Sequence, residues 1–234
     1  MADLSSFKIT QRWPAVNSDV IQLYSLPTPN GIKVSAMLEE TGLPYEPHLI
    51  DFGSNDQKTP EFESLNPNGK IPAIIDPNGP DGKPIGLFES GLILQYLAEK
   101  TGMFIPADAA GRYETLQWLH FQMGGLGPMF GQLGFFVKFA GKDIEDPRPR
   151  QRYIDEAVRL LGVLEGRLTG RNYIMGEDYT IADIAIWPWL RALNGFYEAG
   201  ELVGINRFPS VLAYADRCQA RPASQKAVNI PARS

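Results

Sequence analysis

The chain has 234 residues, of which 44% are hydrophobic, and 22 lysines and arginines stand against 27 aspartates and glutamates, for a net charge of -5. The hydrophobic fraction is ample for a buried core in one large domain or two small ones. The mild negative charge excludes a general attraction to nucleic acid or to anionic membranes, so an anionic ligand has to be held locally.

Several other classes of protein are also disfavoured. No apolar run approaches the roughly 18 residues that a membrane-spanning helix needs, and the first ten residues lack the apolar core of a signal peptide, so we expect a cytoplasmic protein. The single cysteine, Cys218, can form neither an internal disulfide nor a CxxC pair. His48 and His120 lie far apart without cysteine companions, so we expect no metal site.

The first half of the chain mixes strand and helix patterns. After a polar arm over 1–18, residues 20–26 are typical of a strand, and 31–42 carry apolar residues at helical spacing. The patterns that follow predict strands at 45–50, 71–76 and 85–88 and a helix at 90–102. This order predicts a mixed sheet in an α/β domain over 19–102.

The second half contains only helical patterns. A segment with a proline and small residues, 103–110, is the expected linker, and the all-α domain is expected over 111–234. Its predicted helices span 111–139, 149–169, 181–195 and 208–220. In the third of these, Thr180 and Asp183 form a capping box, and Trp187 and Trp189 are interpreted as packing residues.

The junction between the first predicted strand and helix reads SLPTPNGIKV. Pro27 and Pro29 prevent the strand from continuing, and Gly31 relaxes the backbone, so a turn is predicted here. The start of a helix directs unpaired N–H groups toward one point, and an anion is the natural occupant of that point.

Two further segments have both a structural and a functional interpretation. The loop over 66–72 enters a predicted strand whose second residue is Pro72. If the Ile71–Pro72 bond is cis, the main-chain N–H and C=O of Ile71 are free to pair with an extended peptide. If the bond is trans, the proline simply marks the start of the strand. Ser90 can be an ordinary helix cap. Alternatively, Glu89 and Ser90 together can bind the ammonium and carboxylate of a free amino acid.

The stretch QMGGLGPMFGQ, 122–132, places four glycines and a proline in a predicted helix. Each glycine lowers the stability of a helix by about 0.5 to 1 kcal/mol relative to alanine, so another interaction must offset this loss. We favour close packing of another helix or subunit over a kink that opens a cavity. The residues that would line such a cavity are Met123, Met129, Phe130, Phe135 and Phe136.

These segments, taken in order, resemble the cytosolic glutathione transferases over nearly the whole chain. The narrower resemblance is to the bacterial Nu class, which is related to the fungal nitrogen-regulator transferases. The stretches that carry it are PTPNG (27–31), NPNGKIP (66–72), FESG (88–91), LQW (116–118), GGLGPM (124–129) and IADIAIWPW (181–189). The resemblance implies a thioredoxin-like N-terminal domain that binds glutathione, an all-helical C-terminal domain and a homodimer.

The resemblance also implies roles for individual residues. Thr28 and Asn30 would lie beside the glutathione sulfur, and Glu89 and Ser90 would bind the γ-glutamyl head. Arg152 would reach a second glutathione, with Arg148, Arg150 and Arg159 as alternatives. The remaining implied contacts are Gln57 at the glycyl end, Lys70 through either its side chain or its backbone, and Ile71, ahead of a cis Pro72, at the cysteinyl unit. The arm before residue 20 is longer than the family minimum, and one interpretation places it across the partner subunit.

The activity that the resemblance implies is reduction of disulfides by bound glutathione, with two glutathiones or one oxidised glutathione per site. A chain without an active-site cysteine must borrow its sulfur, which fits this chemistry. The alternatives are a transferase or peroxidase acting on small electrophiles or hydroperoxides, and a non-catalytic module of the same fold. Tyr24 invites comparison with transferases that use a tyrosine, but its place in the strand pattern favours packing.

Overall fold

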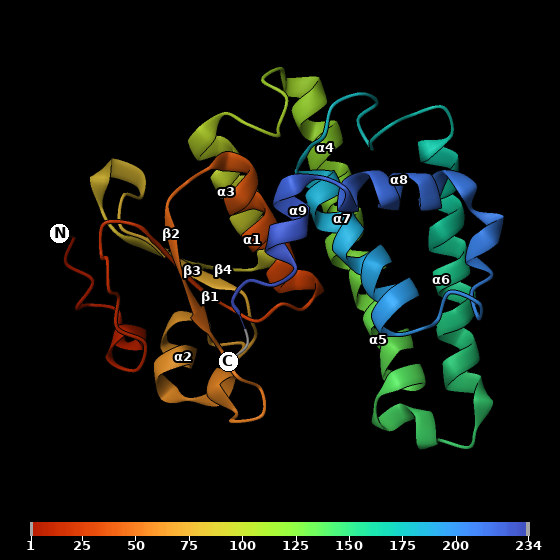
Figure 1. The fold of residues 1–234 in the computed structure, drawn as a ribbon, viewed down its shortest axis with the longest axis horizontal. Coiled ribbons are helices and arrows are strands. Elements are labelled where there is room, and N and C mark those ends of the chain that lie inside the picture. Colours follow the sequence, from red (N-terminus) through yellow and green to blue (C-terminus); the bar gives the residue numbers. More distant parts are fainter. Residues whose placement is uncertain (1, 233–234) are drawn as a thin grey trace. The chain divides into compact units, whose positions relative to one another are not determined.

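The computed structural model describes residues 2–232, and its helices and strands are drawn in Figure 1. The chain forms two compact units, each with its own interior. One, the sheet unit, contains the described residues up to Thr101 together with those from Pro222 onward. The other, the helical unit, spans Gly102–Arg221.

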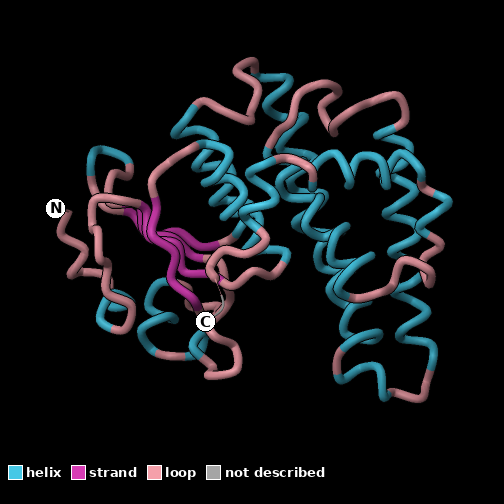
Figure 2. The backbone as a smooth tube through the Cα atoms, viewed as in Figure 1, coloured by secondary structure: helices cyan, strands magenta, loops and turns pink. Residues whose placement is uncertain are grey.

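The sheet unit is built on four strands in the order β2-β1-β3-β4. Figure 2 shows the strands in magenta among the helices of this unit. The strands are β1 (Ile21–Ser25), β2 (Tyr45–Leu49), β3 (Ala73–Asp76) and β4 (Ile85–Phe88). β1 pairs in parallel with β2 and antiparallel with β3, and β3 pairs antiparallel with β4. The mixed sheet and the order of its elements confirm the predicted thioredoxin-like domain.

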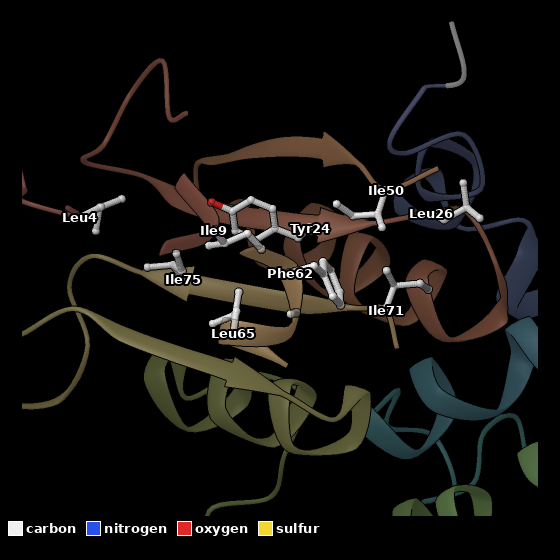
Figure 3. Close-up of a cluster of buried hydrophobic side chains, with 10 residues drawn as sticks. Leu4, Ile9, Tyr24, Leu26, Ile50, Phe62, Leu65, Ile71 and Ile75 are labelled. Carbon is white, nitrogen blue, oxygen red and sulfur yellow. The ribbon is translucent and has the colours of Figure 1, made fainter. Parts of the chain in front are cut away.

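Three α-helices accompany these strands: α1 (Pro29–Thr41) and α3 (Ser90–Thr101), which were predicted, and α2 (Pro60–Leu65), which was not. Because successive side chains on a strand point to opposite faces, Tyr24 and Ile75 face one side of the sheet. There they join Phe62 and Leu65 of α2 in a buried cluster, shown in Figure 3. α1 and α3 pack against each other.

The N-terminal arm is part of this core rather than a polar extension. Leu4 and Ile9 are buried in the cluster of Figure 3, and a short 3₁₀ helix spans Lys8–Gln11. Arg12 forms an ion pair with Asp56 at 2.6 Å. Leu4 and Ile9 are thus buried in the sheet unit, with Phe7 and Trp13 partly buried against the same cluster, so the arm is more than the polar extension that was predicted.

The end of the chain also differs from the predicted division into 19–102 and 111–234. The short helix α9 (Pro222–Ala227) packs against α1. The Ser35 hydroxyl donates to the carbonyl of Ala227 at 3.1 Å, and the Lys226 ammonium lies 3.4 Å from the Glu39 carboxylate. These contacts place the described residues from Pro222 onward in the sheet unit, whereas the predicted division assigned them to the all-α domain over 111–234.

The helical unit contains α4 (Ala109–Phe121), α5 (Gly127–Lys138), α6 (Pro147–Leu168), α7 (Ile181–Arg191) and α8 (Pro209–Gln219). The predicted helix 111–139 is therefore two α-helices, joined by a π-helical segment at Gln122–Leu126. A second π-helical segment, Ala192–Phe196, follows α7. α4 begins at Ala109 because the Asp108 side chain accepts the Gly111 N–H at 2.8 Å, which shortens the predicted linker.

The glycines over 122–132 divide between two roles. An added Cβ at Gly127 or Gly131 would lie 3.1 Å or 3.4 Å from the ring of Trp189, so these two glycines allow close packing, as predicted. Gly124 and Gly125 instead lie in the π-helical segment, with no tight contact. Close packing therefore explains only the second half of the stretch.

The predicted capping box is confirmed at the start of α7. The Asp183 carboxylate accepts the Thr180 N–H at 2.8 Å and the Ile174 N–H at 2.9 Å. Trp187 and Trp189 are both buried, which confirms their role in packing. Across residues 2–232 no helix has the length and apolar character required to cross a membrane, and no cluster of side chains is suited to hold a metal ion.

Candidate active site

The junction between β1 and α1 places the start of a helix at the end of a central strand. Thr28 caps α1, and its hydroxyl oxygen accepts the Gly31 N–H at 3.4 Å. α1 begins at Pro29, two residues before the predicted start, because proline suits the first helical position. A Cβ at Gly31 would lie 1.9 Å from the Leu26 carbonyl oxygen, so only glycine allows this close approach of helix and strand.

Thr28 is therefore available for a second hydrogen bond. A hydroxyl that accepts one hydrogen bond retains its own proton as a donor. Among residues 2–232 that proton has no acceptor, and the side chain is half-buried. Together with the positive end of the α1 dipole, it forms a donor site for an anion. Asn30, the next candidate, is the second residue of α1 and is also half-buried.

The loop before β3 contains a cis peptide bond between Ile71 and Pro72. This observation decides between the two interpretations in favour of the cis form. β3 begins at Ala73 rather than 71, because Pro72 has no N–H to donate to the sheet. Neither the N–H nor the C=O of Ile71 is used in a backbone hydrogen bond within the described chain, so both are available to an extended ligand.

Gln57 lies beside this loop. It belongs to a 3₁₀ helix, Asp56–Lys58, and a Cβ at Gly69 would be 3.0 Å from the Gln57 carbonyl oxygen. The side-chain oxygen of Gln57 is buried and accepts no hydrogen bond from the described residues. The Asn66 side-chain amide donates to the Lys70 carbonyl at 2.5 Å, which leaves the exposed ammonium as the more accessible group of Lys70.

Glu89 and Ser90 stand at the start of α3. Glu89 has a positive φ of 72°, and its carbonyl accepts the Ile93 N–H at 2.9 Å. Glu89 rather than Ser90 therefore caps the helix, and Ser90 is the first helical residue. The Glu89 side chain is exposed, whereas Ser90 is buried. An exposed carboxylate beside a helix start suits a ligand that carries both an ammonium and a carboxylate.

The comparisons with known proteins identify the family. Residues 19–99 match the family described as "Glutathione S-transferase, N-terminal domain", and residues 149–217 match "Glutathione S-transferase, C-terminal domain". Over 210 residues the chain is 44% identical to "Disulfide-bond oxidoreductase YfcG" of Escherichia coli, covering 89% of this chain and 94% of that protein. This chain belongs to the glutathione S-transferase family.

Solved structures of similar transferases contain glutathione. A glutathione transferase from Burkholderia graminis, with two glutathione molecules bound per subunit, is 68% identical and has a TM-score of 0.99, covering 100% of this chain and 98% of that one. One from Pseudomonas putida, with one glutathione disulfide bound per subunit, is 58% identical and has a TM-score of 0.96, covering 98% and 99%.

One residue of this transferase site was missed by the sequence analysis. Lys33 of α1 is completely buried, and its ammonium lies 3.3 Å from the Ser90 hydroxyl oxygen. Burial lowers the pKa of Lys33 to about 7, and the nearby charge of Glu89 opposes this shift. The available signal was that Lys33 is the only charged residue in the otherwise apolar or small stretch GIKVSAML, 31–38.

Arg152 lies in the helical unit of the transferase, on α6. With Arg159 it lines a hollow of about 570 Å³, together with Met129, Tyr153, Asp155 and Glu156. Arg159 is engaged by Glu156 at 2.7 Å, and Arg148 by Asp146. Arg152 forms no hydrogen bond or ion pair with a described residue. The Arg159 hydrogen bond, together with the charges of Arg159 and Arg152, lowers the pKa of the Glu156 carboxyl, so Arg152 keeps its N–H donors for a ligand while its charge also acts on Glu156.

Two other groups can be assigned to the transferase core. Tyr24 is completely buried and stacks on His48 with ring centroids 4.7 Å apart, which confirms its packing role. Cys218 is buried, and burial raises the pKa of its thiol well above the ordinary value. A buried thiol that resists ionisation is a poor nucleophile.

Proposed function

We propose that this transferase is a glutathione-dependent disulfide-bond reductase of the Nu class, and that the thiolate of bound glutathione is its nucleophile. Two observations together support this proposal. The Thr28 hydroxyl at the capped start of α1 has a proton left to donate, and the only cysteine of the chain, Cys218, is buried. Such a protein offers a site for a thiolate but no thiolate of its own. The name of the Escherichia coli relative and the glutathione disulfide bound to the Pseudomonas putida transferase support this activity.

Glutathione would lie as an extended peptide along the cis-proline loop. The Ile71 main chain, ahead of Pro72, would pair with the cysteinyl unit, as in the addition of a strand to a sheet edge. Glu89 and Ser90 would hold the γ-glutamyl head. At the glycyl end, the buried oxygen of Gln57 would accept an N–H, and the Lys70 ammonium would pair with the carboxylate.

Thr28 and Asn30 would then stabilise the sulfur anion. A thiol with a pKa of about 8.5 to 9 is mostly ionised at pH 7 only if the site favours the anion by about 2 to 3 kcal/mol. A hydrogen bond to a charged acceptor contributes about 1.5 to 3 kcal/mol, and a helix start about 0.3 to 1 kcal/mol. The Thr28 hydroxyl and the α1 start therefore supply enough stabilisation.

The reaction consists of two thiol–disulfide exchanges. The bound thiolate attacks one sulfur of the substrate disulfide, forms a mixed disulfide and releases the other sulfur as a thiolate. A second glutathione, as its thiolate, attacks the glutathione sulfur of the mixed disulfide. This exchange forms oxidised glutathione and releases the second substrate thiolate. The two substrate thiolates take up two protons from water, which replace the two that the glutathione thiols released on ionising.

Arg152 is the favoured group for binding the second glutathione. It is the one arginine of the four candidates that lines the hollow of the helical unit and forms no hydrogen bond or ion pair with a described residue. A guanidinium binds a carboxylate through two parallel hydrogen bonds. The family resemblance supports a homodimer, which sedimentation of the purified protein would test. The thiol chemistry of the proposed reaction requires a reducing environment, so we also propose a cytoplasmic location.

Thr28→Ala tests the mechanism. Ultraviolet titration of the glutathione complex should show the pKa of the bound thiol rising by about one unit or more, since one charge-assisted hydrogen bond is lost. Reduction of hydroxyethyl disulfide should slow at neutral pH, and Thr28→Ser should restore both properties. An unchanged titration would remove Thr28 from the mechanism, and a much higher rate with chlorodinitrobenzene than with the disulfide would favour a conjugating transferase.

Arg152→Ala tests the second site. The Michaelis constant for glutathione in the second exchange should rise about tenfold, because a bidentate pair with a carboxylate is lost. Arg150→Ala is the matched control, since Arg150 is exposed on the same helix but does not line the hollow. Equal effects of the two substitutions would contradict the assignment.

A further inference from the structure

Lys33 is the least expected residue of the sheet unit. It extends from α1 toward the start of α3, has no exposed surface, and places its ammonium 3.3 Å from the Ser90 hydroxyl oxygen. In water the same ammonium would be fully hydrated. Burial of a lysine is disfavoured unless its charge meets compensating groups.

Packing alone does not explain a lysine at this position. A methionine would fill a similar volume between the two helices without desolvating a charge. Ser90, by contrast, gives the ammonium a specific partner. A hydroxyl that accepts a hydrogen bond from a cation is polarised and becomes a stronger donor to an anion on its other side.

The proposed position of the γ-glutamyl head supplies that anion. This head carries an ammonium and an α-carboxylate on the same carbon. The exposed Glu89 carboxylate complements the ammonium, whereas Ser90 and the amides at the start of α3 are neutral. A full positive charge behind Ser90 would complete the match to the carboxylate.

We infer that Lys33 is a positioning residue for the γ-glutamyl carboxylate, acting through the Ser90 hydroxyl. This inference rests on the proposed binding of glutathione and deepens it by adding a determinant of specificity. The ammonium of Lys33 donates to Ser90, and Ser90 donates to the carboxylate. Lys33 itself does not touch the ligand, so its contribution is electrostatic and depends on the presence of that carboxylate.

The experiment compares two ligands on two proteins. The ligands are glutathione and γ-aminobutyryl-cysteinylglycine, which lacks only the α-carboxylate, and the variant is Lys33→Met. Calorimetry should show that the original protein binds glutathione about tenfold or more tightly than the analogue, as expected for a charge-assisted interaction. Lys33→Met should lose most of this preference by weakening the binding of glutathione, with the analogue bound as before.

A purely structural role predicts a different pattern, in which Lys33→Met weakens both ligands equally and keeps their ratio. That result would overturn the inference. Lys70→Met is the matched control because the exposed Lys70 is assigned to the other end of the peptide and should leave the ratio unchanged. If the original protein binds neither ligand, the proposed function itself fails, which is a distinguishable outcome.

A second measurement keeps the inference testable if Lys33→Met does not fold. In the ¹⁵N-lysine-labelled original protein, the side-chain resonance of Lys33, assigned through Lys33→Arg, should shift when glutathione binds. The analogue without the carboxylate should leave the resonance near its position in the free protein. Identical responses to the two ligands would contradict the inference.

Discussion

Lys33 and Asp183 are ionisable side chains buried near the start of a helix, one in each unit, and their surroundings differ. Lys33 in α1 of the sheet unit and Asp183 in α7 of the helical unit both have no exposed surface. In both, burial moves the pKa toward neutrality: down to about 7 for Lys33 and up to about 6 for Asp183.

The difference lies in what the buried charge meets. Both oxygens of Asp183 accept backbone N–H groups, from Ile174 and Thr180, so its hydrogen bonds lie entirely within one unit and serve the fold. The Lys33 ammonium meets the hydroxyl of Ser90, a residue proposed to bind glutathione. A buried charged group whose hydrogen bonds all go to backbone N–H groups thus indicates a structural role. A buried charged group that contacts a proposed glutathione-binding residue indicates a role in binding.

Asp183→Ala should have the largest effect on stability. It leaves two buried N–H groups, of Ile174 and Thr180, without acceptors, and each such group costs about 1 to 3 kcal/mol. We therefore expect the free energy of unfolding in urea to fall by about 3 kcal/mol or more. Asp178→Ala, at a nearby exposed position, should change it by less than about 0.5 kcal/mol. Similar losses for both would show that the capping box is not special.

Gly134→Ala tests how tightly the helical unit is packed. The added Cβ would lie 2.6 Å from the ring of Tyr197, and overpacking of this kind costs about 1 to 3 kcal/mol. Gly124→Ala, in the π-helical segment that precedes α5, meets nothing within 4 Å. It should leave the urea midpoint unchanged or raise it, since alanine favours helix. The reverse order of the two variants would contradict the division of roles among these glycines.

The pH dependence of stability isolates Lys33 in the ligand-free protein. Its folded pKa of about 7 lies below its ordinary value of 10.5. Between these values the unfolded chain holds a proton that the folded chain has lost, so the free energy of unfolding rises with pH. From pH 7 to pH 9, the original protein should gain about 1 to 2 kcal/mol relative to Lys33→Met. Parallel pH profiles would show that Lys33 stays charged in the folded state.

Much of the fold and most of the candidate site followed from local sequence signals. The strand 85–88, the capping box of α7 and the turn at 27–31 depend on residues within a few positions of one another, whose backbone preferences act before any distant contact forms. For the same reason Pro72, Glu89 and Ser90 could be singled out from local signals, whereas Thr28 and Asn30 were assigned through the family resemblance. The resemblance to a family added roles that local physics alone left open.

Only the tertiary structure could reveal the rest, because it depends on partners that are distant in the chain. Lys33 meets Ser90 across 57 residues, and Ser35 meets Ala227 across 192, so no local pattern announces either contact. The burial of Leu4 and Ile9 under the sheet likewise required the core to be assembled. The sequence by itself determined the type and order of most helices and strands and the turn at the start of α1, because local backbone preferences set them. Tertiary structure decided their exact bounds, the cis form of the Ile71–Pro72 bond and the charge that lies behind the start of α3.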